Sequence, residues 1–203
     1  MARTGRPRSF DRAETLRQAM TVFWRLGYEG ATLEDLQAAM GGISPPSMYA
    51  AFGSKENLFR EAAELYVTTI GGRPMRALAT ETTGRAAVQA MLHEAVDLFC
   101  TPGMPAGCLV VTGAVNCAPA SKGVHDHLQQ FRQQAPTLIQ DRLEQAVADG
   151  DLPAGRDLAA IASFYATVLH GLAIRAHDGA PHEALMAAAD TAMAAWDHLT
   201  AAQ

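Results

Sequence analysis

Apolar residues recur every three or four positions along most of the chain, a spacing that predicts helices. In the first such segment they form one face made of Leu16, Ala19, Met20, Phe23 and Leu26. Beyond position 74 no stretch alternates apolar and polar residues as strands do. Alanine is abundant, whereas β-branched and aromatic residues are sparse, which also favours helices. We therefore expect an all-α protein of about nine helices.

Polar residues at the breaks in this pattern predict where the first two helices begin. Asp11 can cap the first helix, and Glu14 stands at the spacing of a reciprocal capping box. Gly27 should end that helix. Thr32 is then a suitable cap for a second helix over 33–40.

The stretch Ser44-Pro45-Pro46 predicts a short third helix. Ser44 would cap it, and the two prolines would occupy its first two positions, where a backbone N–H has no partner within the helix. The helix should reach about position 51. Ser54 would then cap a fourth helix that reaches about position 70.

The sequence Gly-Gly-Arg-Pro at 71–74 is a break in the pattern and a suitable domain boundary. We expect a basic tail, a first domain that includes the fourth helix, and a larger second domain. These cover residues 1–9, 10–70 and 71–203. Helices in the second domain are expected over about 84–100, 107–117, 121–148, 157–177 and 181–200.

The last two predicted helices indicate a homodimer. The helix over 157–177 is apolar nearly all round and needs covering on both sides, and the helix over 181–200 carries an apolar seam. A central helix within one subunit is the alternative. The expected interface residues are Ile161, Tyr165, Leu169, Leu172, Leu185, Ala189, Ala192 and Trp196. The uncharged run 158–174 is shorter than the ~20 residues of a membrane span, so no membrane partner is expected.

Charge is distributed unevenly along the chain. Residues 1–60 hold eight Lys and Arg against six Asp and Glu, whereas the remainder holds eight against fifteen. A basic N-terminal segment followed by an acidic remainder indicates an anionic partner that binds at the N-terminal end. Cys100, Cys108 and Cys117 are an odd number of cysteines without a signal peptide, which favours the reducing cytoplasm.

The first four predicted helices have the order of a helix-turn-helix domain. The segment "FWRLGYEGATLEDLQAAMGGISPPSMYAAFGSKENLFREAAELY" at 23–66 resembles the N-terminal signature of TetR/AcrR-family transcriptional regulators. The resemblance rests on Gly27-Tyr28, Thr32, Ile43-Ser44, Met48-Tyr49, Phe52 and Ser54-Lys55-Glu56. One departure is the pair Gly41-Gly42, where the family more often has a single glycine. The resemblance implies a homodimer on a palindromic double-stranded DNA operator, most often a repressor, and no enzyme.

The resemblance also implies residues that contact DNA. Hydroxyls and a helix N-terminus suit phosphate, prolines can offer apolar contact to a thymine methyl, and arginines in a tail can follow the backbone or a groove. A cation at a helix N-terminus is poorly matched to the helix dipole unless a phosphate lies opposite. The implied contacts are Arg3, Arg6, Arg8, Thr32, Ser44, Pro45, Pro46, Ser47, Tyr49 and Lys55.

The second domain resembles, less specifically, the region of the same family that dimerises and binds an effector. Aromatic residues and methionine would suit a small hydrophobic or aromatic effector, although the same residues could form plain core. The candidate pocket residues are Phe99, Met104, Cys108, Val111, Phe131, Phe164 and His170.

Two other functions remain open at this point. The cysteines could make a thiol-based redox switch on the same scaffold, although none has an obvious cationic neighbour that would lower its pKa. A helical enzyme that uses a group such as His170 is the other. No set of His and Cys has zinc spacing, and there is no phosphate-binding loop, so we expect no metal and no cofactor.

Overall fold

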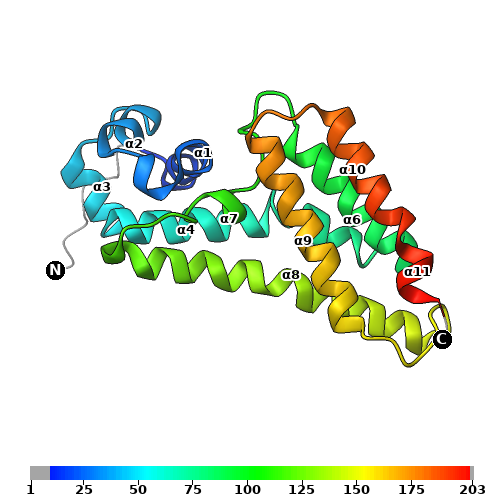
Figure 1. The fold of residues 1–203 in the computed structure, drawn as a ribbon. Helices are drawn as coiled ribbons and strands as arrows, with labels where there is room; N and C mark the ends of the chain where they lie inside the picture. Colours follow the sequence, from blue (N-terminus) through cyan, green and yellow to red (C-terminus); the bar gives the residue numbers. More distant parts are fainter. Residues whose placement is uncertain (1–9, 202–203) are drawn as a thin grey trace.

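The computed structural model describes residues 10–201, which form α-helices and one short 3-10 turn without any strand. The prediction of an all-α fold is confirmed. Figure 1 shows a small group of helices at one end, joined through α4 to a longer body. The small group consists of α1 (Arg12–Gly30), α2 (Leu33–Ala39) and α3 (Pro45–Phe52), with α4 (Lys55–Thr68) beneath it. The body consists of α5 (Arg73–Ala77), α6 (Gly84–Phe99), α7 (Leu109–Thr112), the 3-10 turn (Pro119–Ser121), α8 (Lys122–Ala148), α9 (Leu158–His177), α10 (His182–Ala194) and α11 (Trp196–Thr200).

The caps of α2, α3 and α4 are the predicted ones. Thr32 forms a capping box with Asp35, in which each side chain accepts from the other residue's backbone N–H. Ser44 and Ser54 each accept a backbone N–H of the first turn that follows. Pro45 and Pro46 lie in the first turn of α3, as expected from their missing N–H groups.

The predicted capping box of α1 is wrong. Asp11 caps the helix by accepting from the backbone N–H groups of Ala13 and Glu14. The Glu14 carboxylate instead pairs with Arg17 one turn further along α1. A salt bridge to a guanidinium replaces the reciprocal half of the box.

Gly27 interrupts α1 with φ 69° and ψ 177°, a region of backbone space that is essentially restricted to glycine. The bend turns the N–H of Tyr28 toward the carbonyl oxygen of Gly113, at 2.7 Å between N and O. A Cβ at position 27 would lie 3.1 Å from that same carbonyl oxygen. Gly27 therefore ends the regular part of the first helix, as predicted, and permits the contact between α1 and the segment after α7.

Three boundaries differ from prediction. Helix α5 forms where only a break was expected, because Pro74 suits the first turn of a helix. The helix expected over 107–117 is reduced to the four residues of α7. The last helix is divided at Ala195 into α10 and α11.

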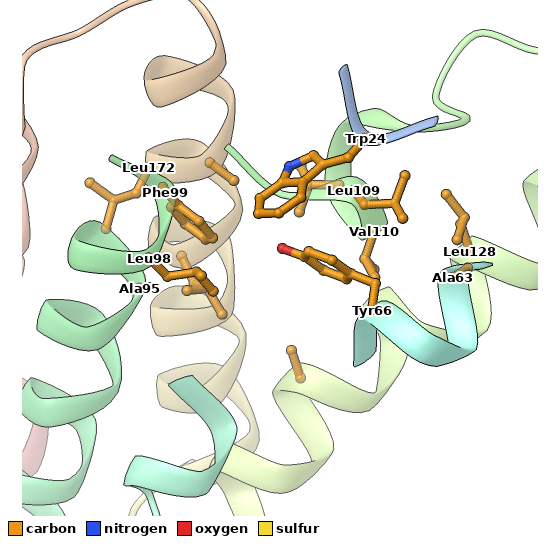
Figure 2. Close-up of a cluster of buried hydrophobic side chains, with 14 of the residues drawn as sticks. Trp24, Ala63, Tyr66, Ala95, Leu98, Phe99, Leu109, Val110, Leu128 and Leu172 are labelled. Atoms are coloured by element: carbon orange, nitrogen blue, oxygen red, sulfur yellow. The ribbon is translucent and has the colours of Figure 1, made fainter. Parts of the chain in front are cut away.

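The small domain and the body share one continuous core (Figure 2). The Trp24 ring of α1 lies edge-on to the Tyr66 ring of α4, with centroids 4.8 Å apart. Its indole N–H donates to the carbonyl oxygen of Gly107, at 3.2 Å. Phe99 of α6 and Val110 of α7 add to the same cluster. The domain boundary predicted at 71–74 therefore does not correspond to a gap in the packing.

The structure corrects the prediction of a dimer interface. All eight residues named for it lie inside the subunit, each at most 8% exposed. They are Ile161, Tyr165, Leu169, Leu172, Leu185, Ala189, Ala192 and Trp196. The alternative, a central helix within one subunit, describes this side of α9. The side that remains exposed carries Phe164 and Ile174 instead.

Among the described helices, α9 alone has the length and mean hydropathy, 1.4, to cross a membrane. It packs against α6, α8 and α10 in the body. These contacts account for only part of its apolar character, because 39% of its apolar window is buried.

We predict that Gly27→Ala lowers the free energy of unfolding by about 1–3 kcal/mol, because alanine is strained in that backbone conformation. Urea denaturation followed by circular dichroism measures the change. Gly30→Ala is the matched control, because it has no positive φ and its Cβ would lie at an ordinary 3.8 Å from Leu26. Equal stability of the two variants would contradict the assigned bend.

Candidate nucleic-acid interface and ligand cavity

One face of helix α3 packs against the core of the small domain, and the opposite face is exposed to solvent. Met48 and Phe52 are buried, at 1% and 4% exposure. Pro45, Pro46 and Tyr49 point away from this core, and Tyr49 is 41% exposed. A short helix whose first turn and one face are free can approach another molecule without changing the core behind it.

The predicted hydroxyl groups lie at the starts of α2 and α3, but they differ in availability. Ser44 donates to the hydroxyl of Ser47, at 2.9 Å between the oxygens, and both stay near the surface. The Thr32 hydroxyl and its backbone N–H both donate to Asp35, at 2.6 and 3.0 Å. These bonds lower the pKa of the Asp35 carboxyl, so Thr32 already has an anionic partner within the chain.

Lys55 has an internal partner that the sequence analysis missed. Its ammonium lies over the ring of Tyr28, 4.5 Å from the centroid. Burial lowers the pKa of Lys55, and the nearby charge of Glu29 opposes that shift. The aromatic ring therefore holds a cation at the beginning of α4, where the helix dipole alone would disfavour it. The predicted contacts Arg3, Arg6 and Arg8 lie outside the described residues.

A cavity of about 360 Å³ lies in the body, and its lining comes from α4 through α9. Five of the predicted pocket residues line it: Phe99, Cys108, Val111, Phe131 and His170. Two others do not belong to it. Met104 is absent from the lining, and Phe164 lies on the outer face of α9, beside a groove against α10.

Sequence reasoning missed most of the cavity wall. Arg132 and Leu138 of α8 and Arg76 of α5 all line the space. The turn between α4 and α5 contributes a further part of the wall, which includes Gly71 and Gly72. Arg132 directly follows Phe131, but no local pattern shows that its side chain turns toward α7.

The thiols and the histidine near the cavity favour their neutral forms. Burial raises the pKa of the thiols of Cys100, Cys108 and Cys117, which disfavours the reactive thiolate. The expectation that no cation lies near a cysteine is wrong for Cys108 and Cys117, because the charge of Arg132 opposes this rise in their pKa. Burial, and then the charge of Arg132, lowers the pKa of His170. The described residues contain no group of three or more His, Cys, Asp or Glu side chains that could hold a metal ion.

Several polar contacts join the small domain to the segment around α7 and α8. In addition to the bonds to Gly107 and Gly113, the backbone N–H of Ala118 donates to Glu29, at 3.0 Å. Arg60 of α4 donates to the carbonyl oxygen of Gly123, at 2.9 Å. Val110 and Val111 of α7 line the cavity, so a short element touches both the cavity and the contacts to α1.

Comparison with known families matches both parts of the chain. Residues 16–62 match the description "Bacterial regulatory proteins, tetR family", and residues 84–192 match "Tetracyclin repressor-like, C-terminal domain". The first range contains α2, α3 and most of the small domain. The second range contains the cavity wall from α6 through α9 and most of α10.

Whole proteins are similar over nearly the full length. The HTH-type transcriptional repressor ComR of Escherichia coli (strain K12) is 32% identical over 196 residues, which cover 96% of this chain and 93% of that protein. The repressor BdcR of the same organism is 29% identical over 185 residues, covering 91% and 88%. A solved structure of the TetR family transcriptional regulator CifR, a cysteine mutant in complex with a 26-base-pair double-strand operator DNA, is 46% identical with a TM-score of 0.91. It covers 94% of this chain and 100% of that one. With both domains matched and a relative of this similarity across the whole length, the chain belongs to the tetR family of bacterial regulatory proteins.

Proposed function

We propose that this protein is a homodimeric transcriptional repressor that binds a palindromic operator through α3 and leaves it when a small hydrophobic effector occupies the cavity. The observation that carries the proposal is α3 itself, a short helix with a buried rear face and an exposed Ser-Pro-Pro start. The names of ComR and BdcR, and the operator complex of CifR, support it. Such a regulator would act in the cytoplasm, on the chromosome.

The exposed groups of α3 suit DNA in different ways. The Tyr49 phenol and the Ser44 and Ser47 hydroxyls can donate to phosphate oxygens or base edges, whereas Pro45 and Pro46 can offer only apolar contact, such as to a thymine methyl. Lys55, held by the Tyr28 ring, supplies a charge for a backbone phosphate. Two copies of α3 in a dimer would read half-sites about one helical turn, 34–36 Å, apart.

The open side of α9 and α10 supports a homodimer. A groove of about 370 Å³ runs between these helices, which lie next to each other along one side of the body (Figure 1). Phe164, 39% exposed, lines it. A Cβ added at Gly171 would meet no atom within 4 Å, so the backbone there is open to close approach by another helix. Two of the residues first named for the interface, Leu172 and Ala192, also line this groove, whereas the other six do not.

We predict that Lys55→Gln reduces the salt dependence of operator binding. Loss of one phosphate contact should lower the slope of log K against log salt concentration by about one per subunit. Fluorescence anisotropy with an operator selected from random duplexes measures the slope. Lys122→Gln is the control, because Lys122 is an exposed residue of α8 that pairs with Asp126. An unchanged slope in Lys55→Gln would remove Lys55 from the interface.

We predict that Phe164→Glu converts the dimer to monomer at micromolar concentration, because burying a carboxylate in this largely apolar groove costs free energy. Sedimentation equilibrium measures the mass. Leu26→Glu is closely matched, because Leu26 is also 39% exposed but lies on α1, and it should remain dimeric. A dimer in both variants would place the interface on another face.

We predict that Leu138→Trp weakens uptake of the neutral fluorescent probe N-phenylnaphthylamine by about tenfold, or about 1.4 kcal/mol, because the larger ring occupies part of the space that the probe would fill. Leu138 lines the cavity and is 43% exposed, so the larger ring can be accommodated without disrupting the core. Leu26→Trp, on α1, should leave the titration unchanged. Equal affinity in the two variants would show that the probe does not use this cavity.

A further inference from the structure

The cavity has an unusual charge for its surroundings. The segment from residue 61 to the C-terminus holds fifteen Asp and Glu against eight Lys and Arg. Among the described residues that line the cavity, however, there are two arginines, Arg76 and Arg132, and no Asp or Glu. The cavity wall is therefore positively charged although the surrounding domain is acidic. A wall of this charge favours the entry of anionic ligands.

Arg132 is the less exposed of these two cations. Its guanidinium donates one hydrogen bond, at 2.8 Å, to the carbonyl oxygen of Val110 in α7. Burial lowers its pKa from a value so high that the group stays charged. Within residues 10–201 no carboxylate lies within ion-pair distance of it. Five of the other described arginines, Arg12, Arg17, Arg60, Arg73 and Arg85, each pair with an Asp or Glu, whereas the remaining five have no such partner.

The Arg132 guanidinium has five N–H donors and one acceptor among the described residues, so its other donors are open to water or to a ligand. A planar anion offers it two charge-assisted hydrogen bonds at once. His170 also borders the space, but its lowered pKa keeps it neutral, so Arg132 and the exposed Arg76 are the cations present.

Most of the remaining wall is apolar. Phe99, Val111, Phe131, Leu138 and Leu169 supply aromatic and aliphatic surface. A volume of about 360 Å³ is at the lower end of the range for small-molecule sites, about 300–1,000 Å³. The wall therefore suits a compact molecule with one charged end and an apolar body of up to three rings, or a short chain.

We propose that the effector is an amphipathic organic anion, such as an aromatic or aliphatic carboxylate, whose charged group pairs with Arg132 while its apolar body fills the cavity. This inference rests on the proposed function and specifies the ligand class of the same cavity.

Arg132 also links the ligand to the DNA-binding domain. The carbonyl oxygen to which it donates belongs to α7. The segment that includes α7 accepts the N–H of Tyr28 at Gly113 and the indole N–H of Trp24 at Gly107. An anion that draws the guanidinium away from Val110 removes one of the bonds that hold α7, and α7 in turn contacts α1. The ligand then changes the orientation of helices α1, α2 and α3 relative to the body, through the contact between Tyr28 and Gly113 that Gly27 permits.

The test compares two fluorescent probes that differ in one group. Anilinonaphthalene sulfonate carries an anion, and N-phenylnaphthylamine is its neutral counterpart. Both are titrated into the full-length dimer of the wild type, Arg132→Met, Arg132→Lys and, as an exposed control, Arg25→Met. Thermal denaturation verifies that each variant is folded. Anisotropy with a selected operator then measures whether the sulfonate releases DNA.

We expect the wild type to bind the sulfonate about tenfold or more tightly than the neutral probe, as for a hydrogen-bonded charge pair. Arg132→Met should lose this preference, while Arg132→Lys keeps part of it and Arg25→Met all of it. The sulfonate should weaken operator binding by the wild type and not by Arg132→Met.

Three results would overturn the inference: equal affinity for the two probes, a preference for the neutral probe, or an undiminished preference for the sulfonate in folded Arg132→Met. If the neutral probe alone binds and releases the operator, the anionic effector is excluded while the proposed function stands. If the protein binds no selected operator at all, the proposed function fails, and the two titrations still decide the ligand class.

Discussion

The junction of α1 with the segment around α7 is the constraint on which the remaining structure depends. The Trp24 ring packs on Tyr66 and donates to Gly107, and the bend at Gly27 allows the N–H of Tyr28 to reach Gly113. These groups are buried or half-buried, so breaking the bonds would leave polar atoms without partners. The direction in which α3 faces is therefore tied to the position of a four-residue helix that also borders the cavity.

Local features were predictable from the sequence because a cap is an interaction between residues at most three positions apart. Thr32, Ser44 and Ser54 take the roles that their neighbours indicate, and Pro45 with Pro46 starts α3 as the missing N–H groups require. The same reasoning was wrong at Glu14, where Arg17 offers a stronger partner than the backbone of the cap. Side chains that compete for one carboxylate cannot be ranked by spacing alone.

The candidate site was less predictable because it depends on how helices distant in sequence are rotated against one another. The apolar residues of α9 were identified, but not which of them face α6 and α8, so buried positions such as Tyr165 were assigned to a partner subunit. The aromatic residues of the cavity were predicted from the sequence, but its charge was not. That charge comes in part from Arg132, which forms its hydrogen bond to α7 only in the folded chain. Similarly, the ring under Lys55 belongs to Tyr28, a residue of α1 that lies close to it only after folding.

The continuous core has a consequence for engineering. Because Trp24, Tyr66, Phe99 and Val110 belong to a single cluster, the DNA-reading end is not a detachable module. A chimera that grafts α1 to α4 onto a foreign sensor would need that sensor to supply the carbonyl acceptors at positions 107 and 113 and an apolar surface for Tyr66. Exchanges that carry the 107–118 loop along with the first four helices preserve these complementary surfaces, whereas a cut at the glycine pair 71–72 divides them.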